Sequence, residues 1–194
     1  MQLSKLGSIA LLLLSVTGVA SARETILVLD DCDPRDSGWS EIGGCTLEKG
    51  DVSVAEFNAL LPEGHPAWRF EPAYLKIEKG DKLSVVNRGG RLHTFTEVED
   101  FGGGFIPQLN PPGSEPAPEC LDQAIVDAST LQPGARLKFQ EDEAGLELYQ
   151  CCLHPWMRMA IRVKSGEDDD EDSAKERDSE HSSDTVHWQQ RTFE

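Results

Sequence analysis

The stretch Tyr149-Gln150-Cys151-Cys152-Leu153-His154-Pro155-Trp156-Met157 decides how the rest of this chain is interpreted. It places a thiol, an imidazole and a thioether at intervals of three residues, on a segment between two predicted strands. Such a segment can turn all three side chains toward one point. A second imidazole from elsewhere in the chain would complete a four-ligand metal site.

The types of side chain select the metal. Thiolate and thioether are soft ligands that favour copper among the common ions, and two His, one Cys and a weak axial Met are the ligands of a blue-copper site. Calcium and magnesium are excluded because they bind oxygen ligands. Structural zinc sites use four Cys or His ligands and seldom a Met. The sequence therefore predicts copper, held in part by Cys151, His154 and Met157.

The second imidazole is best supplied by His93, in a predicted strand or strand end from Leu92 to Val98. His65 precedes the predicted strands, and His181 and His187 lie in or beyond the acidic C-terminal run, so we interpret these three as surface histidines. The alternative is that the two adjacent cysteines are half-cystines and the His and Met only pack. The strand context and the upstream histidine favour the metal site.

The surrounding sequence has the pattern of a β-sandwich or barrel. Short apolar runs follow one another from Phe70, separated by turns such as Lys79-Gly80-Asp81 and Gln132-Pro133-Gly134. The stretch from Phe101 to Glu119 is rich in Gly and Pro and predicts a long loop. Later strands are predicted around Arg136 to Gln140, Glu147 to Cys151 and Met159 to Lys164. We assign residues 67–165 to this domain.

The first 22 residues have the features of a secretory signal peptide. Lys5 precedes an apolar run from Ile9 to Leu14, and Ala20-Ser21-Ala22 is a small-residue cleavage site. No stretch approaches the roughly 20 apolar residues that a membrane helix needs. We expect an exported protein, periplasmic or secreted, with no membrane span in its mature form. A retained N-terminal anchor is the competing interpretation.

Five cysteines remain after removal of the signal peptide. In an oxidising compartment an odd number leaves one thiol for another task. If Cys151 binds the metal, the other four can form two disulfides. Cys32 and Cys45 bracket a turn-rich stretch that a local disulfide would fix, and Cys120 is then left for Cys152. Four cysteines nevertheless allow three pairings.

Two segments flank the predicted domain. Residues 23–66 are expected to form an N-terminal extension, with a short helix that begins at the capping box Ser53/Glu56 and ends at Pro62. Residues 166–194 open with an acidic, apolar-poor run and are expected to be disordered. This tail is either a solubilising segment or a means of attracting a basic partner. The formal net charge of -17 argues against nucleic acid as a partner.

These pieces resemble the cupredoxins, the plastocyanin and amicyanin type of small blue copper protein. The matching parts lie between Phe70 and Lys164: FEPAYLKIEKGDKLSVVN, the histidine of RLHTF, then LQPG, and LYQCCLHPWM followed by a strand. The resemblance implies an all-β, Greek-key sandwich with the ligands His93, Cys151, His154 and Met157. It also implies a single copper ion per chain that alternates between Cu(I) and Cu(II).

The resemblance further implies how electrons leave the site. His154 would present its ring edge at the surface, and Pro155, Trp156 and Met159 would form an apolar docking rim. Carriers of this kind use small, transient interfaces with a redox partner protein, so we expect a monomer. Thr94 departs from the family pattern, because many members have Asn directly after the first histidine ligand.

Four functions are compatible with this sequence to different degrees. An electron carrier is the leading hypothesis, and storage or delivery of copper in the exported compartment is the alternative. An enzyme is disfavoured, because multicopper enzymes usually flank the ligand cysteine with histidines, whereas Gln150 and Cys152 flank Cys151. A metal-free interaction module held by disulfides is the fourth possibility.

Overall fold

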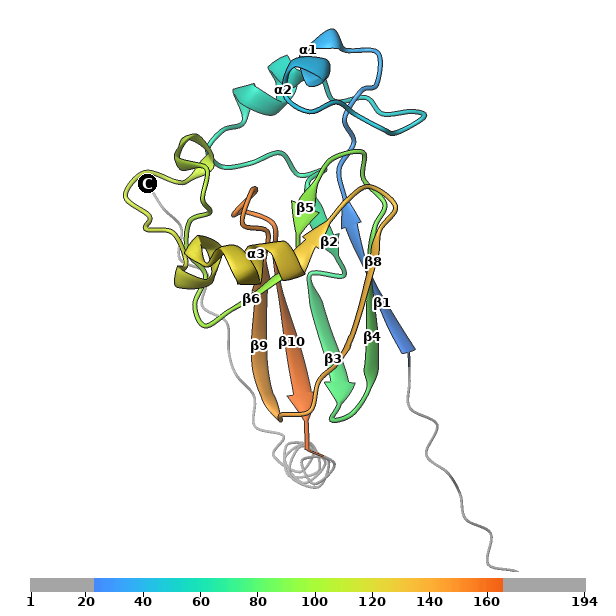
Figure 1. The fold of residues 1–194 in the computed structure, drawn as a ribbon, viewed down its shortest axis with the longest axis vertical. Helices are drawn as coiled ribbons and strands as arrows, with labels where there is room; N and C mark the ends of the chain where they lie inside the picture. Colours follow the sequence, from blue (N-terminus) through green and yellow to red (C-terminus); the bar gives the residue numbers. More distant parts are fainter. Residues whose placement is uncertain (1–22, 166–194) are drawn as a thin grey trace, which may run out of the picture.

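Two four-stranded β-sheets face each other in the computed structural model, which describes residues 23–165 (Figure 1). The first sheet has the strand order β2-β1-β4-β8 and the second has the order β3-β10-β9-β6. A short pair, β5 with β7, forms a third sheet. The predicted signal peptide and the predicted acidic tail lie outside the described residues.

The strands are short, as the spacing of turns in the sequence predicts. They are β1 (Arg23–Leu29), β2 (Arg69–Glu71), β3 (Tyr74–Glu78), β4 (Lys82–Asn87), β5 (His93–Thr94), β6 (Thr96–Val98), β7 (Thr130–Leu131), β8 (Arg136–Gln140), β9 (Gly145–Gln150) and β10 (Arg158–Lys164). The helices are α1 (Ser37–Glu41), α2 (Val54–Ala59) and α3 (Gln123–Ser129), with 3-10 turns η1 (Pro107–Leu109) and η2 (Pro118–Leu121). Within residues 23–165, none of these helices has the length and apolar content needed to cross a bilayer.

The core of the sandwich follows from the period-2 alternation of side chains along the strands. In β10, Met159, Ile161 and Val163 are each at most 2 % exposed, whereas Arg162 between them is exposed. The inward side chains of both sheets join one apolar cluster. The structure therefore confirms the predicted all-β sandwich.

The first sheet contains one strand that the sequence analysis assigned to the N-terminal extension. β1 pairs antiparallel with β2 and parallel with β4, and its Ile26 and Val28 are fully buried. The first sheet thus includes residues 23–29, which precede the expected domain 67–165 in the sequence. The parallel partner of β1 lies more than 50 residues further along the chain, and the alternation within one seven-residue strand does not identify such a partner.

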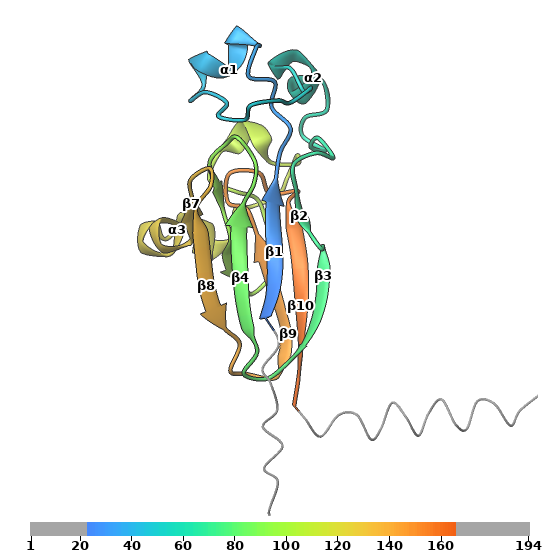
Figure 2. The same cartoon turned by 90° about the vertical axis from the view of Figure 1, so that its right-hand side faces the viewer.

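Residues 31–68, which we call the cap, leave the end of β1 and cover one end of the sandwich with α1 and α2 (Figures 1 and 2). The predicted capping box begins α2: the Ser53 hydroxyl accepts from the Glu56 N–H at 3.2 Å, and the Glu56 carboxylate accepts from the Ser53 N–H at 2.9 Å. Helix α1 was not predicted. It is only five residues long and begins at the N-cap Asp36.

Three aromatic side chains pack the cap together. The rings of Trp39 and Trp68 stack at 5.6 Å, and Phe57 lies 4.8 Å from Trp68 and 5.5 Å from Trp39. All three side chains are at most 5 % exposed. The Trp39 indole N–H donates to the Val52 carbonyl at 2.9 Å, which satisfies its one polar atom inside the cluster.

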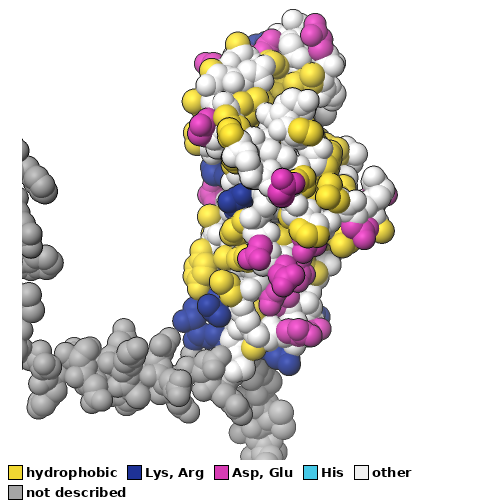
Figure 3. Space-filling model, turned by 90° about the vertical axis from the view of Figure 1, so that its left-hand side faces the viewer, with side chains coloured by type: hydrophobic (Ala, Val, Ile, Leu, Met, Phe, Trp, Pro, Cys, Tyr) yellow, Lys and Arg dark blue, Asp and Glu magenta, His cyan; other side chains and the backbone are white. Residues whose placement is uncertain are grey.

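Carboxylates gather over the lower part of the face shown in Figure 3. Glu97, Glu99, Glu119 and Glu147 line a surface cavity of about 720 Å³ beside β6 and β9. Partial burial, followed by repulsion from Glu147, raises the pKa of Glu97. This face therefore carries carboxylates that repel one another.

We expect Glu97→Gln to stabilise the protein slightly at pH 7. A carboxyl whose pKa is raised on folding costs stability above that pKa, and the cost disappears as the pH falls below the unfolded value. The gain should be a few tenths of a kcal/mol, because the group is largely solvated. Urea unfolding at pH 7 and again well below pH 4 measures it. The exposed Glu63→Gln is the control, and an equal gain at both pH values would contradict the prediction.

Candidate metal centre

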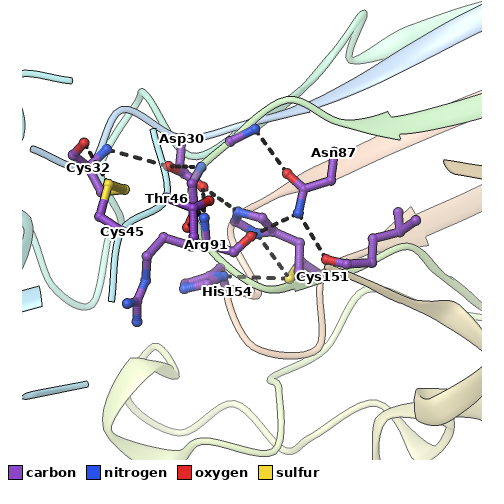
Figure 4. Close-up of polar contacts among 12 residues, drawn as sticks. Asp30, Cys32, Cys45, Thr46, Asn87, Arg91, Cys151 and His154 are labelled. Carbon is purple, nitrogen blue, oxygen red and sulfur yellow. Dashed lines mark hydrogen bonds and ion pairs between the residues drawn. A yellow bond between two sulfur atoms is a disulfide. The ribbon is translucent and has the colours of Figure 1, made fainter. Parts of the chain in front are cut away.

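Three ligand-type side chains, one from β5 and two from the turn between β9 and β10, meet beneath the cap. The ligand atoms of His93, Cys151 and His154 all lie within 4.8 Å of one another. The Cys151 sulfur is 3.8 Å from Nδ1 of His93 and 3.6 Å from Nδ1 of His154. Figure 4 shows the His154 ring directed toward this sulfur. The structure thus brings together three of the four predicted ligands around a single point.

The spacing of these atoms fits one metal ion. With metal–nitrogen bonds of about 2.0–2.1 Å, a metal–sulfur bond of about 2.3 Å and an angle near 110–120°, nitrogen and sulfur lie about 3.6–3.8 Å apart. The two observed distances, 3.6 and 3.8 Å, fall in this range. Cys151 is also the free cysteine among residues 23–165. The donor set, one thiol and two imidazoles, is that of a blue-copper site.

The turn between β9 and β10 positions two of these ligands and the fourth predicted one. The Cys151 N–H donates to the Met157 carbonyl at 3.0 Å, and the Met157 N–H donates to the His154 carbonyl at 2.9 Å. These two bonds close the turn and direct His154 back toward the cysteine. The Met157 side chain is 1 % exposed and belongs to the same apolar cluster as Cys151.

Asp30 holds the other ring nitrogen of His93. The distance from its carboxylate to Nε2 is 2.9 Å, and both side chains are fully buried. The same carboxylate accepts from the N–H groups of Gly90 at 2.9 Å and Arg91 at 3.0 Å. Occupying Nε2 in this way turns Nδ1 toward the Cys151 sulfur, as carboxylates do behind many metal-bound histidines.

Sequence reasoning missed Asp30. The residue lies in the run Leu29-Asp30-Asp31-Cys32-Asp33, which has the composition of an exposed acidic turn. The one available signal is its position directly after a strand with buried alternating residues. That strand was itself not recognised, so this signal could not be used.

The three groups shift one another's protonation. Burial alone would lower the pKa of His93, but its contacts with Asp30 and Cys151 outweigh burial and raise it to about 9. Burial would raise the pKa of the Cys151 thiol, yet His154 and His93 hold it well below its usual value. Burial lowers the pKa of His154. These contacts favour the thiolate form of Cys151, the form that binds metals.

Thr94 connects the two ligand-bearing segments. Its N–H donates to the Cys151 sulfur at 3.4 Å, and its hydroxyl accepts from the Cys152 N–H at 2.8 Å. A second hydroxyl, that of Thr96, donates to Thr94 Oγ1 at 2.9 Å. Thr94 thus ties the ligand segments together at the position where the family pattern has Asn.

Asn87, at the end of β4, holds the segment that carries His93 in place through side-chain hydrogen bonds. Its side-chain amide donates to the Arg91 carbonyl at 2.8 Å and to the Leu131 carbonyl at 2.9 Å, and its oxygen accepts from the Gly89 N–H (Figure 4). Leu131 is the register partner of His93 in the β5–β7 pair. The turn before the ligand is therefore fixed on both sides.

Two disulfides flank the centre. The structure pairs Cys32 with Cys45 inside the cap, and Cys120 with Cys152 beside the ligand turn. The second bond ties the long Gly- and Pro-rich loop to the residue next to Cys151. That loop holds the turns η1 and η2 and one bridge between Gly103 and Pro116, and α3 follows it.

The surroundings of His154 differ from what the family resemblance implies. The residue is 7 % exposed, because Phe57 of the cap lies 6.2 Å from its ring and Trp156 lies 5.5 Å away. Pro155 is buried, and Met159 is 2 % exposed because its position in β10 turns it into the core. Of the three residues expected to form a docking rim, Trp156 alone is partly exposed.

A groove leads from the surface to His154 between the cap and the loops of the sandwich. It has a volume of about 480 Å³ and is lined mainly by apolar side chains. Ile42 and Phe57 belong to its cap side, and Ile106, Leu109 and Leu153 belong to the sandwich side. His154 thus lines a groove whose walls are mainly apolar.

Comparison with known proteins gives matches among solved structures alone: no family model and no curated protein matches the chain. One similar structure is a novel purple cupredoxin from Nitrosopumilus maritimus, 16 % identical, covering 72 % of this chain and 98 % of that chain with a TM-score of 0.39. A reduced amicyanin variant is 21 % identical, covering 50 % of this chain and 73 % of that chain with a TM-score of 0.33. Another amicyanin variant, in the Cu(I) form, is 20 % identical over the same shares, also with a TM-score of 0.33. The chemistry of the centre is therefore argued from its own side chains, His93, Cys151 and His154.

Proposed function

We propose that this chain is an exported type-1 copper protein that carries one electron at a time. His93, Cys151 and His154 bind the metal, with Met157 as the axial ligand. The observation that supports this most strongly is the convergence of one thiolate and two imidazole nitrogens at 3.6 and 3.8 Å in a buried pocket. Copper bound there supplies a one-electron couple between Cu(I) and Cu(II).

The protein's own residues prepare the site. Asp30 orients His93, the Thr94 N–H fixes the Cys151 sulfur, and the backbone bonds of the 151–157 turn fix His154. These contacts are made by the protein's own atoms, so the donors need little rearrangement when the charge of the site changes. A preorganised site of this kind lowers the cost of moving an electron in or out.

Electrons reach the site through His154. Its ring contacts Trp156 and Phe57, and the apolar groove beside it opens to the surface. The partner in this proposal is a redox protein that docks transiently with a small apolar surface, while the chain itself remains a monomer.

Burial of the ligands favours an electron carrier over the alternative, a protein that stores or delivers copper. The three ligand residues are at most 7 % exposed and lie beneath a cap that contains a disulfide. A delivery protein has to release its metal to an acceptor, which requires access to the ligands. A carrier keeps the metal and exchanges only the electron.

Reconstitution with Cu(II) tests the proposal. The mature protein should develop an intense visible thiolate-to-copper charge-transfer band and show a reversible one-electron wave by voltammetry. Absence of the band in the folded, metal-loaded protein would contradict the proposed site. Repeated reduction and oxidation with a copper chelator in excess separates the two functions: a carrier keeps its band, and a delivery protein loses it.

A further inference from the structure

Four cationic side chains share the outer face of the first sheet. The register aligns Arg23 with Lys82, and places Lys138 and Arg136 on the neighbouring strand at two successive outward positions. Side chains alternate across a strand, so the four point to the same side of the sheet, and all are exposed. We call Arg23, Lys82, Arg136 and Lys138 the basic face. Figure 2 shows its strands β1, β4 and β8 side by side.

Within residues 23–165 the basic face makes no salt bridge. None of its four side chains forms an ion pair with a carboxylate of residues 23–165, and Arg136 donates instead to the Ser84 hydroxyl at 2.7 Å. The four line a shallow cavity of about 430 Å³. Glu24 also contributes to the lining, but strand alternation places it on the inner side with Ile26. The protein as a whole has a formal net charge of -17, so this cluster is unusual for the chain.

The described chain ends close to the basic face. At the end of β10 the Lys164 carbonyl accepts from the Lys79 N–H at 2.9 Å. The next residue, Gly80, donates its N–H to the Glu141 carbonyl at 2.7 Å, and the same turn leads directly into Lys82. The start of β1 and the end of β10 lie at the same end of the sandwich (Figure 2). Whatever follows Ser165 therefore begins beside one edge of the basic face.

The sequence that follows is an uninterrupted acidic run, Glu167-Asp168-Asp169-Asp170-Glu171-Asp172. Packed sheets are about 10 Å apart and an extended chain spans about 3.3 Å per residue, so about three residues span the distance between the sheets. The run is thus long enough to reach the basic face. Covalent attachment over so short a distance also gives an effective concentration of about a millimolar.

We propose that the acidic run 167–172 binds the basic face of its own chain. Carboxylates that meet lysine and arginine form charge-assisted hydrogen bonds, and arginine can hold a carboxylate with two of them. The face of Glu97, Glu99, Glu119 and Glu147 repels the run, which leaves the basic face as its favoured contact. The run is then an internal counter-charge that competes with other polyanions for this face. This inference goes beyond the proposed function and does not rest on it.

Two cations on the outer face of the second sheet provide a matched control. Lys76 and Arg162 are register partners in β3 and β10, and both are exposed. Glu78 follows on the same side of β3, so this pair already has a carboxylate neighbour. Reversing the charges of this pair changes the net charge as much as reversing two charges of the basic face.

The test compares backbone amide NMR shifts of the metal-free chain from Arg23 to Glu194 at about 20 mM and about 500 mM salt, because salt screens exposed charges. In the wild-type protein, amides of residues 167–172 and of β1, β4 and β8 should shift together between the two conditions. Lys82→Glu/Lys138→Glu should abolish the shared shifts, whereas Lys76→Glu/Arg162→Glu should retain them.

A second variant keeps the test decisive if the lysine variant fails to fold. Asp168→Asn/Asp169→Asn/Asp170→Asn lies beyond the sandwich and should abolish the same shifts. Equal spectra of β1, β4 and β8 at both salt concentrations would overturn the proposal. Loss of the shifts in the Lys76/Arg162 variant with retention in the Lys82/Lys138 variant would also overturn it. Shifts that grow with protein concentration would assign the contact to a second copy and would also overturn it.

Discussion

Cys151→Ser is expected to abolish the visible thiolate-to-copper band completely. Cys151 supplies the one free sulfur that the described residues place at 3.6 and 3.8 Å from both imidazole nitrogens. A serine oxygen is a harder and weaker ligand for copper than a thiolate. It also cannot take part in the sulfur-to-copper charge transfer that produces the band. Absorption and electron paramagnetic resonance spectra of the Cu(II)-loaded variant measure the effect.

The neighbouring sulfur provides the control for this experiment. Cys120→Ala/Cys152→Ala removes the disulfide beside the ligand turn and leaves Cys151 in place. It should keep the band but lower the free energy of unfolding by about 3–4 kcal/mol, because the bond closes a long loop. A band that survives in Cys151→Ser, or is lost in the folded double variant, would contradict the assignment of Cys151 as the ligand.

The second large effect is expected for Asp30→Asn. The substitution removes a buried negative charge 2.9 Å from Nε2 of His93. Such charges stabilise Cu(II) more than Cu(I), so the reduction potential should rise. Removing a carboxylate behind a ligand histidine typically costs roughly 10–100-fold in metal affinity. Voltammetry and competition with a chelator measure the two changes.

The geometry around Asp30 adds an effect on stability. Its Oδ2 accepts from the Arg91 N–H and contacts His93 Nε2, and its Oδ1 accepts from the N–H groups of Gly90 and, at 3.4 Å, Cys32. An asparagine at this position can place its oxygen toward the first pair, but its amide nitrogen then faces the Gly90 N–H. That unmade hydrogen bond should cost about 1–3 kcal/mol in the metal-free protein.

An exposed carboxylate is the control for Asp30. Asp142→Asn makes the same change of charge at a residue that is exposed and bonded to Gln140. It should leave the potential and the copper affinity unchanged. If Asp30→Asn likewise leaves both unchanged, Asp30 does not tune the metal centre.

The ligand turn could be predicted because its information is local. Cys151, His154 and Met157 are six residues apart at most. The softness of their ligand atoms indicates copper without any knowledge of the fold. The start of α2 was predictable for the same reason, since Ser53 and Glu56 are separated by one helical turn. His93 followed by exclusion, as the remaining histidines lie outside the predicted strands.

The features that the sequence did not predict depend on contacts between distant parts of the chain. Asp30 meets His93 across 63 residues, and β1 finds its place only through β4. The cap that buries His154 depends on Phe57 and Trp39, whose spacing in sequence does not show which surface they cover. Helix α3 had a usable signal, the N-cap Asp122, but no apolar period long enough to distinguish it from a loop.

The cap over His154 has a consequence for how fast and how selectively the centre exchanges electrons. Both imidazoles and the Cys151 sulfur are shielded from solvent, so few water molecules would have to reorient if copper bound there gained or lost charge, as proposed. A small reorganisation energy permits rapid transfer even when the driving force is modest. In the proposed carrier, the groove between the cap and the sandwich would then set which surfaces can approach His154.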